Sequence, residues 1–177
     1  TGGYDGKGVL KIQDLAEAQD WLDRLEDGQT LLAEEAVPFD KELAVLLARR
    51  PSGEVRCWPV VQTIQENGVC SVVLAPAPDL SDQIDQQARE LGERIATELD
   101  VTGVLAVEMF AVGDGADTKL YVNELAMRPH NSGHWTIEGS ITSQFEQHLR
   151  AVLDLPLGDT APVSDGAAMV NLLGSEL

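Results

Sequence analysis

The stretch "VLAVEMFAVGDGADTKLYVNELAMR", Val104 to Arg128, contains two apolar segments joined by a short polar loop. Alternate side chains of a strand point to the same side of a sheet, so each segment carries one glutamate on a largely apolar face. We expect a β-hairpin with Asp114–Thr118 as its loop, which places Glu108 directly opposite Glu124. The residues expected to share a strand face with Glu108 are Val104, Ala106, Phe110 and Val112, and those expected beside Glu124 are Leu120, Val122, Ala126 and Arg128.

Two carboxylates that face each other on an apolar surface repel, and burial increases the cost. Arg128 is the only cation expected on the same strand face, and one guanidinium balances one carboxylate. A divalent cation such as Mg²⁺ would balance the remaining charge, because carboxylate oxygens are among its preferred ligands. The alternative is a register shifted by one residue, which would send Glu108 and Glu124 to opposite faces. The pattern alone leaves both interpretations open.

The composition excludes some classes of partner. The chain has 177 residues with 30 acidic and 12 basic side chains, a formal net charge of -18 that repels nucleic-acid phosphates. No apolar run approaches the roughly 18 residues of a membrane helix, and no basic leader precedes an apolar segment. We therefore expect a cytoplasmic protein with no nucleic acid or membrane partner. Cys57 and Cys70 are expected to be reduced, structural thiols.

The first 50 residues give mixed signals. A helix is expected to begin at Asp14, an N-cap type followed by Glu17, and to end at Gly28. Its expected apolar face consists of Leu15, Ala18, Leu22 and Leu25. The stretch "TLLAEEAVPF" predicts a short strand that stops at Pro38, whereas residues 41–50 fit either a helix or a strand.

The remaining segments predict an α+β fold with mainly antiparallel sheets and flanking helices. Residues 55–64 and 69–77 are β-rich and, with residues 41–50, are interpreted as three antiparallel strands, in which Gln65 faces Cys70. A long helix after Ser81 is expected to bury Ile84, Ala88, Leu91, Ile95 and Leu99. A last amphipathic helix is expected to bury Ile141, Phe145, Leu149 and Val152, and "AAMVNLL" is expected to add a strand.

The glycine-rich segment "GGYDGKG", residues 2–8, is not a GxxxxGK[ST] phosphate loop, because no Ser or Thr follows Lys7. Such a segment still brings backbone N–H groups close to phosphates, and Lys7 adds positive charge. The alternative is an exposed flexible turn. A simple turn requires neither Tyr4 nor Asp5, which favours a binding role.

Four motifs taken together carry a resemblance: "GGYDGKG", "EEAVPFDKE", "VEMF" and "NELAMRPHNSGHWTIEGSITSQFEQHLRAVLDLPLG". The chain resembles the 5-(carboxyamino)imidazole ribonucleotide synthetase family of the ATP-grasp superfamily. The resemblance implies an ATP-grasp fold truncated at both ends. It also implies an ATP- and bicarbonate-dependent ligase of purine biosynthesis that carboxylates 5-aminoimidazole ribonucleotide through carboxyphosphate. ATP with Mg²⁺, or Mn²⁺ in its place, and a homodimer of the full-length enzyme are implied as well.

The resemblance also assigns roles to individual residues. The metal ligands are Glu108 and Glu124. The catalytic positions are Tyr4, Asp5, Lys7, Arg128 and His130, and the ribonucleotide is bound by Arg128, His130 and Asn131. The nucleotide positions are Gly3, Tyr4, Asp5, Gly6, Lys7, Gly8, Glu34, Glu35, Ala36, Val37, Glu42, Gln65, Asn123 and Glu124. Gln65 stands where many members have a histidine, and His134 and Trp135 are expected to pack and orient the acceptor loop.

The resemblance divides the chain into three parts. Residues 1–37 correspond to part of the small ATP-grasp subdomain, residues 38–158 to the large subdomain, and residues 159–177 to the start of a small C-terminal domain. We expect the segment alone to lack synthetase activity. Two alternatives remain: an ATP-grasp ligase with another acceptor, such as the formate-using purine enzymes, and a noncatalytic module that binds nucleotide or metal.

Overall fold

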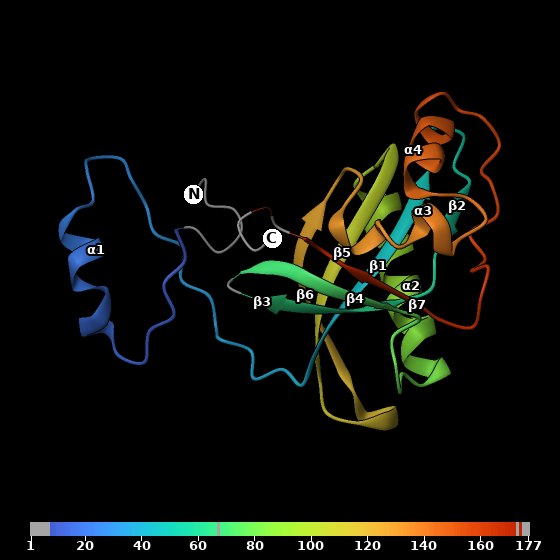
Figure 1. Cartoon of the computed structure of the whole chain (residues 1–177). Coiled ribbons are helices and arrows are strands. Elements are labelled where there is room, and N and C mark those ends of the chain that lie inside the picture. Colours follow the sequence, from blue (N-terminus) through green and yellow to red (C-terminus); the bar gives the residue numbers. More distant parts are fainter. Residues whose placement is uncertain (1–7, 67, 173, 175–177) are drawn as a thin grey trace.

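A computed structural model describes residues 8–66, 68–172 and 174. One antiparallel sheet of seven strands dominates it, in the order β6-β5-β1-β3-β4-β7, with β2 paired to β1 (Figure 1). The strands are β1 (Lys41–Arg49), β2 (Val55–Cys57), β3 (Val61–Glu66), β4 (Val69–Ala75), β5 (Gly103–Val112), β6 (Lys119–Ala126) and β7 (Ala167–Val170). The predicted α+β class is confirmed, and residues 41–50 are resolved in favour of a strand.

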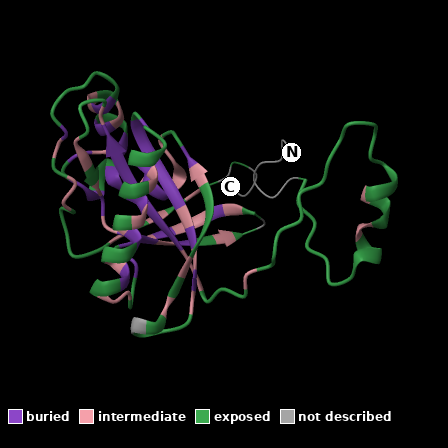
Figure 2. Cartoon of the chain, turned by 180° about the vertical axis from the view of Figure 1, so that it is seen from behind, coloured by how far each residue is buried: buried purple, intermediate pink, exposed green. Residues whose placement is uncertain are grey.

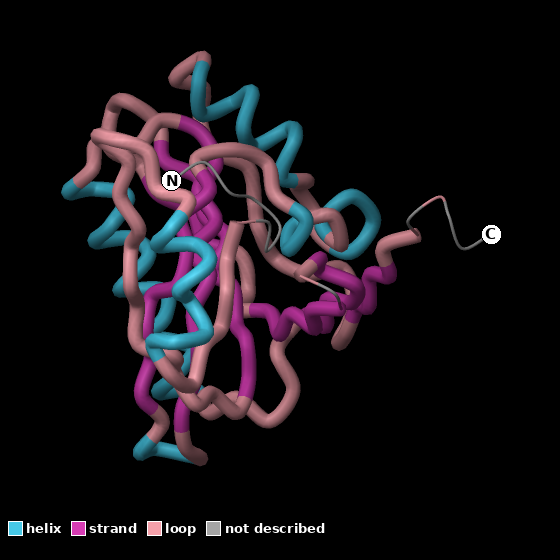
Figure 3. Tube along the Cα trace, turned by 90° about the vertical axis from the view of Figure 1, so that its left-hand side faces the viewer, coloured by secondary structure: helices cyan, strands magenta, loops and turns pink. Residues whose placement is uncertain are grey.

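The helices are α1 (Gln19–Asp23), α2 (Asp82–Glu98), α3 (Thr136–Gly139) and α4 (Gln144–Val152), with 3-10 turns η1 (Leu15–Ala18), η2 (Gly115–Asp117) and η3 (Asn131–Gly133). The α2 helix covers one face of the sheet, and α3 and α4 lie on the other face (Figure 1). The β3, β4 and β7 strands run at a steep angle to β5, and Figure 3 shows the same strong twist. Within the described part of the chain, no helix has the length and apolar character required to cross a membrane.

The β1 strand forms the centre of the core, because both of its faces are covered (Figure 2). Leu46 belongs to a buried cluster with Trp58 and Ala151 of α4, whereas Leu47 packs on the α2 side. Seven consecutive residues of β1 are therefore buried. This explains the ambiguity of its sequence, since a strand buried on both faces reads as a continuous apolar run.

The α2 helix was predicted correctly. It begins at Ser81, whose Oγ accepts a hydrogen bond from the Ile84 N–H, and its apolar side faces the sheet. Gly92 allows a close approach, because a Cβ at this position would lie 2.5 Å from Cγ1 of Val45. Only Leu99, at the end of the predicted apolar side, is largely exposed.

Two predictions for the first 40 residues are wrong. The helix from Asp14 ends at Asp23, before Gly28, and Leu15, Leu22 and Leu25 of its expected apolar face are exposed. Residues 30–39 form no strand and lie in an exposed segment (Figure 2). The physical reason is the same for both: most of their side chains are exposed, and short helices and strands that pack against little else are not stable on their own. Phe39, at the end of the second segment, stacks on Phe110 of β5.

The predicted buried face of α4 is also wrong. The apolar residues Ile141, Phe145, Leu149 and Val152 are exposed, whereas the helix buries Gln144, Gln147 and Ala151. The buried amides are tolerated because they are hydrogen-bonded, as buried polar groups must be. Gln147 accepts from the Gly158 N–H at 2.7 Å and donates to the Gly158 carbonyl at 2.9 Å.

Neither cysteine forms a disulfide, as predicted. The Cys57 thiol lies 3.5 Å from a carboxylate oxygen of Glu93, and burial together with this carboxylate raises its pKa. A thiol whose pKa is raised stays protonated and is a poor nucleophile. Cys57 is therefore a structural residue.

Candidate active site

The β5–β6 hairpin brings Glu108 and Glu124 into direct cross-strand register. The pairing was predicted correctly, but the register that the turn sets is not the register of the two glutamates. Near the turn Val112 pairs with Lys119, and the register shifts by one residue between Met109 and Glu108. Asn123 is the extra residue of this β-bulge, so the bulge sets the facing of the two glutamates.

The bulge also corrects the predicted side-chain faces of β6. Leu120 and Leu125 both pack against the core on the α2 side, so the alternation is interrupted between them. Val122 pairs with Met109, a residue of that same core. Leu120 and Val122 therefore do not share the face of Glu124. The inserted residue changes the face of the sheet to which the β6 side chains before it point, relative to a regular strand.

The electrostatics of the pair match the repulsion expected from the sequence. Burial, followed by the charges of Glu124 and Glu42, raises the pKa of the Glu108 carboxyl to about 7, against a lowering effect of Arg128. Burial also raises the pKa of Glu42. Glu124 is exposed, whereas the Glu108 side chain is 18% exposed. The cluster has more negative than positive charge and is open to a cation on the side of Glu124.

His130 lies beside this pair. Its Nε2 is 3.7 Å from Oε1 of Glu108, and its side chain is 11% exposed. Its Nδ1 accepts the N–H of Ser132 at 3.4 Å and lies 3.0 Å from the Ser132 hydroxyl. Because Nδ1 acts as the acceptor, we assign the ring proton of the neutral form to Nε2, which faces Glu108.

Other predicted site residues gather at the same end of the sheet. Glu42 pairs with Phe110 of β5 and Thr63 of β3, and Gln65 faces Cys70 at a bulge, as predicted. Burial, followed by the charges of Glu108 and Glu42, raises the pKa of Cys70 to about 11. The Cys70 thiol therefore lies within electrostatic range of the carboxylates, which no pattern in the sequence had predicted.

The loop after β6 carries the remaining acceptor-side residues. Arg128 is exposed, and its Nη1 donates to the Pro129 carbonyl at 3.1 Å. Asn131 begins the η3 turn and is half-buried. Arg128, His130 and Asn131 thus follow Glu124 within one short segment, on the side of the sheet where the carboxylates lie.

The segment that precedes β1 holds the predicted adenine-side residues Glu34, Glu35, Ala36 and Val37, of which the first three are exposed. Its end is fixed to β5. The rings of Phe39 and Phe110 stack with centroids 4.5 Å apart. The Asp40 N–H donates to the Ala111 carbonyl at 2.9 Å, and the Asp40 carboxylate accepts the Gly113 N–H at 2.7 Å.

The structure describes only Gly8 of the predicted glycine-rich segment, residues 2–8. Gly3, Tyr4, Asp5, Gly6 and Lys7 lie outside the described residues, and Gly8 is exposed with a φ of 78°. Asn123 is exposed at the bulge. Among the described residues, no group of three or more His, Cys, Asp or Glu side chains is arranged to hold a metal ion. Two protein carboxylates with additional oxygens from a ligand remain compatible with Mg²⁺.

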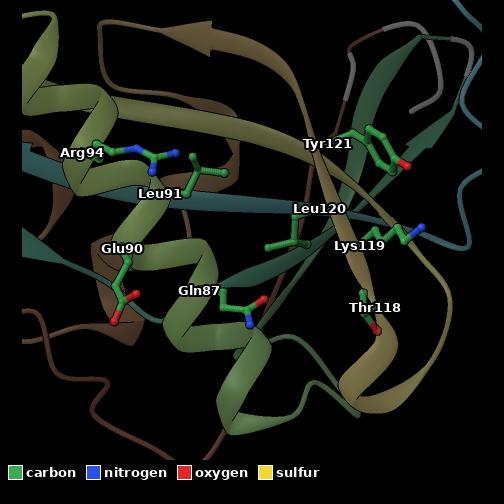
Figure 4. A pocket seen from close by; sticks show the side chains of 8 residues that line it. All are labelled: Gln87, Glu90, Leu91, Arg94, Thr118, Lys119, Leu120 and Tyr121. Carbon is green, nitrogen blue, oxygen red and sulfur yellow. The ribbon is translucent and has the colours of Figure 1, made fainter.

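Two surface hollows lie elsewhere. One of about 580 Å³ separates α2 from β6, and Figure 4 shows Arg94 and Leu91 on the helix with Leu120 and Tyr121 on the strand. Another of about 470 Å³ lies between α3 and β7 and includes Trp135. Neither is lined by Glu108 or Glu124, so the candidate site depends on the carboxylates and the loop after β6 rather than on a closed cavity.

Comparison with known proteins identifies the class to which this architecture belongs. Residues 1–145 match the ATP-grasp domain family. The chain therefore belongs to the ATP-grasp family. It is 54% identical over 177 residues to the N5-carboxyaminoimidazole ribonucleotide synthase of Corynebacterium ammoniagenes, covering 99% of this chain and 43% of that relative.

Solved structures give the same result. A carboxyaminoimidazole ribonucleotide synthase from Aspergillus clavatus complexed with ATP has a TM-score of 0.86 and 40% identity over 97% of this chain and 44% of that one. A second Aspergillus clavatus structure, in complex with ADP and 5-aminoimidazole ribonucleotide, has a TM-score of 0.84 and 38% identity. The match covers 95% of this chain and 44% of that one. The chain thus spans less than half the length of the relatives that it matches.

Proposed function

We propose that the full-length protein containing this chain is an ATP-dependent ligase that carboxylates 5-aminoimidazole ribonucleotide with bicarbonate. The observation that carries the proposal is the facing pair Glu108 and Glu124, with His130 beside it, at one end of an ATP-grasp sheet. The ADP and ribonucleotide complex of the Aspergillus clavatus relative supports this choice of nucleotide and acceptor.

The donor set fits a divalent cation. Glu108 and Glu124 supply carboxylate oxygens, and the raised pKa of Glu108 reflects first its burial and then the negative charges of Glu124 and Glu42. Mg²⁺ takes one or two protein carboxylates together with nucleotide phosphates, and Mn²⁺ accepts the same ligands. When bound, the ion supplies charge neutralisation for phosphoryl transfer. We assign its protein ligands to Glu108 and Glu124.

The remaining roles belong to the residues of the chain itself. Arg128, which lowers the pKa of Glu108 through its charge, adds positive potential at the phosphates. His130 and Asn131 orient the ribonucleotide beside the phosphates. Tyr4, Asp5 and Lys7 act near bicarbonate, and the glycine segment excludes water from carboxyphosphate, which hydrolyses readily.

The nucleotide would extend from the carboxylate pair toward the segment before β1. We assign the adenine contact to Glu34–Val37, with the ribose beside Glu42 and further contacts to Gln65 and Asn123. The stack of Phe39 on Phe110 supports this placement, because it holds the segment next to the strand that carries Glu108.

The division of the chain, its assembly and its location follow from the same assignment. We propose that residues 1–37 belong to the small subdomain, residues 38–158 to the large one and residues 159–177 to a C-terminal domain. In the structure, β7 of the last part pairs with β4 and extends the same sheet. We also propose that the full-length enzyme is a homodimer, as the resemblance implies, and that it acts in the cytoplasm.

A product assay on the full-length enzyme tests the function. Purified enzyme with ATP, Mg²⁺ and 5-aminoimidazole ribonucleotide should form the N5-carboxylated product with bicarbonate, together with ADP, and should form nothing with formate. A formylated product would favour another ATP-grasp ligase. Nucleotide binding without turnover toward either donor would favour a noncatalytic module.

A further inference from the structure

The carboxamide of Gln144 is fully buried at the first position of α4, beneath the loop that carries His130. Its Oε1 accepts the His130 N–H at 2.8 Å, and its Nε2 donates to the His130 carbonyl at 2.9 Å. The same Nε2 lies 2.9 Å from Nδ1 of His134. One side chain therefore pairs with both backbone groups of His130, as a neighbouring strand would.

The surroundings leave this carboxamide no freedom to rotate. The Gln144 N–H donates to Oγ1 of Thr136 at 2.9 Å, and that hydroxyl donates to the Gly133 carbonyl at 2.5 Å. Gly133 packs directly against the carboxamide, because a Cβ there would lie 2.5 Å from the Gln144 Oε1 and 2.6 Å from Leu46. Such a fully hydrogen-bonded buried group fixes a single arrangement of the chain around it.

Two devices together orient the His130 ring. Gln144 fixes the backbone of His130, and Ser132 occupies its Nδ1, which leaves Nε2 directed at Glu108 across 3.7 Å. Loops are usually the least constrained part of a site, whereas this one is held from beneath by a helix. Catalytic geometry of this kind depends on supporting contacts as well as on the groups that touch the substrate.

We propose that Gln144 is a positioning residue, which holds the backbone of His130 so that the Nε2 edge of the imidazole faces Glu108 and the acceptor. The reaction that it serves rests on the proposed function, whereas the placement of the ring does not. The residue does not touch a reacting atom; it acts through His130. Its effect is expected on the use of the ribonucleotide rather than on the binding of ATP.

The chain offers a matched control in Gln147, one turn further along α4. It is also fully buried, and its carboxamide pairs in the same way with the N–H and carbonyl of Gly158. Gln144→Met and Gln147→Met therefore remove the same kind of bond from the same helix. Only the first of them loosens His130.

Both variants should be measured in the full-length enzyme with Mg²⁺. Gln144→Met is expected to lower kcat/KM for 5-aminoimidazole ribonucleotide by about 100-fold, the cost of a misplacement of roughly 1 Å. The KM of the Gln144→Met variant for ATP should change less than about twofold. Gln147→Met should lower Tm by about as much as Gln144→Met does, but with nearly normal kinetics. Equal kinetics of the two variants at equal loss of Tm would overturn the proposal.

A second measurement, of the ¹⁵N shifts of the His130 ring, depends neither on the stability of the variants nor on the proposed function. Ser132→Ala removes only the hydroxyl at His130 Nδ1, and it should change the ¹⁵N shifts of that ring and lower the same kcat/KM by about tenfold. In the wild-type enzyme, ¹⁵N shifts should show His130 Nδ1 as a hydrogen-bond acceptor and Nε2 as protonated. The opposite tautomer would refute the placement of the ring. Wild-type enzyme that shows this tautomer but does not consume the ribonucleotide would refute the function and leave the placement standing.

Discussion

Glu108 on β5 and Glu124 on β6 are cross-strand partners, although the hairpin that joins them changes register by one residue before it reaches them. A single residue, Asn123, is absorbed in the bulge between the turn and the pair. If Asn123 paired regularly with Glu108 instead, Glu124 would lie on the opposite face of the sheet, and no cation could bridge the two carboxylates. Bulges of this kind often occur next to active sites, where they redirect a side chain.

The first prediction concerns Glu124. In the full-length enzyme, Glu124→Gln should lower turnover by roughly 10³-fold or more, because a neutral amide supplies less charge to a bound cation at the phosphates. Steady-state release of ADP and formation of product measure the effect. Glu98→Gln, at an exposed position on α2, serves as the matched control. Near-normal turnover of the Glu124 variant would remove this residue from the metal site.

The second prediction concerns the charge of Glu108 without metal. Its carboxyl should titrate with a pKa of about 7, and Glu124→Gln should lower that pKa, because one of its repelling charges is gone. Side-chain ¹³C shifts of glutamate, followed between pH 4 and 9 without Mg²⁺, report the titration. A Glu108 pKa that does not respond to the substitution would show that the two groups are not coupled.

The raised pKa of Glu108 determines how its contribution to folding stability changes with pH. The folded protein holds the Glu108 proton more tightly than the unfolded chain, whose carboxyl has its ordinary pKa of 4.5. The contribution of Glu108 to stability is thus fully present below about pH 4.5 and is lost as the pH rises through about 7. Added Mg²⁺ should stabilise the wild-type protein more at pH 8 than at pH 6, because the proton and the cation compete for the same oxygens.

The third prediction concerns the packing of α2 on β1. Gly92→Ala places a methyl group 2.5 Å from Cγ1 of Val45 and should destabilise the fold by about 1–3 kcal/mol. The midpoint of urea denaturation measures this loss. Gln83→Ala, exposed on the same helix, should change stability by less than about 0.5 kcal/mol. A neutral effect of the Gly92 variant would mean that the helix lies further from the sheet.

The fourth prediction concerns the stack of Phe39 on Phe110. Phe39 is 45% exposed, so its loss should cost little stability. Phe39→Ala should nevertheless raise the KM for ATP by about threefold to tenfold, since aromatic pairs contribute about 0.5–1.5 kcal/mol and this one holds the adenine-side segment. Phe39→Tyr, which keeps the ring, should restore the wild-type value. An unchanged KM in the alanine variant would contradict the assigned place of the nucleotide.

The sequence was a reliable guide where a short local pattern dictates the structure. The polar loop between two alternating strands predicted the pairing of Glu108 with Glu124, and the 3.6-residue period of α2 predicted its buried side. The bulge at Asn123 was missed, because an inserted residue leaves no mark on composition. The segment from Gly3 to Lys7, where the sequence expected much of the phosphate contact, lies outside the described residues.

The sequence failed where hydrogen bonding over a longer distance overrides hydrophobicity. In α4 the apolar Leu149 is exposed while Gln144 and Gln147 are buried, because partners from the His130 loop and from Gly158 satisfy the amides. A periodicity analysis ranks glutamine as a surface residue and has no means to detect those partners. The support for His130 was therefore missed, although Gln144 follows it by only 14 positions.

The most direct test of the central claim is a crystal structure of the full-length enzyme with a nonhydrolysable ATP analogue and Mn²⁺, located by its anomalous signal. One ion should be found, coordinated directly by carboxylate oxygens of both Glu108 and Glu124, with phosphate oxygens completing its shell. An ion bound to the phosphates without either glutamate, or carboxylates directed to opposite faces of the sheet, would contradict the claim.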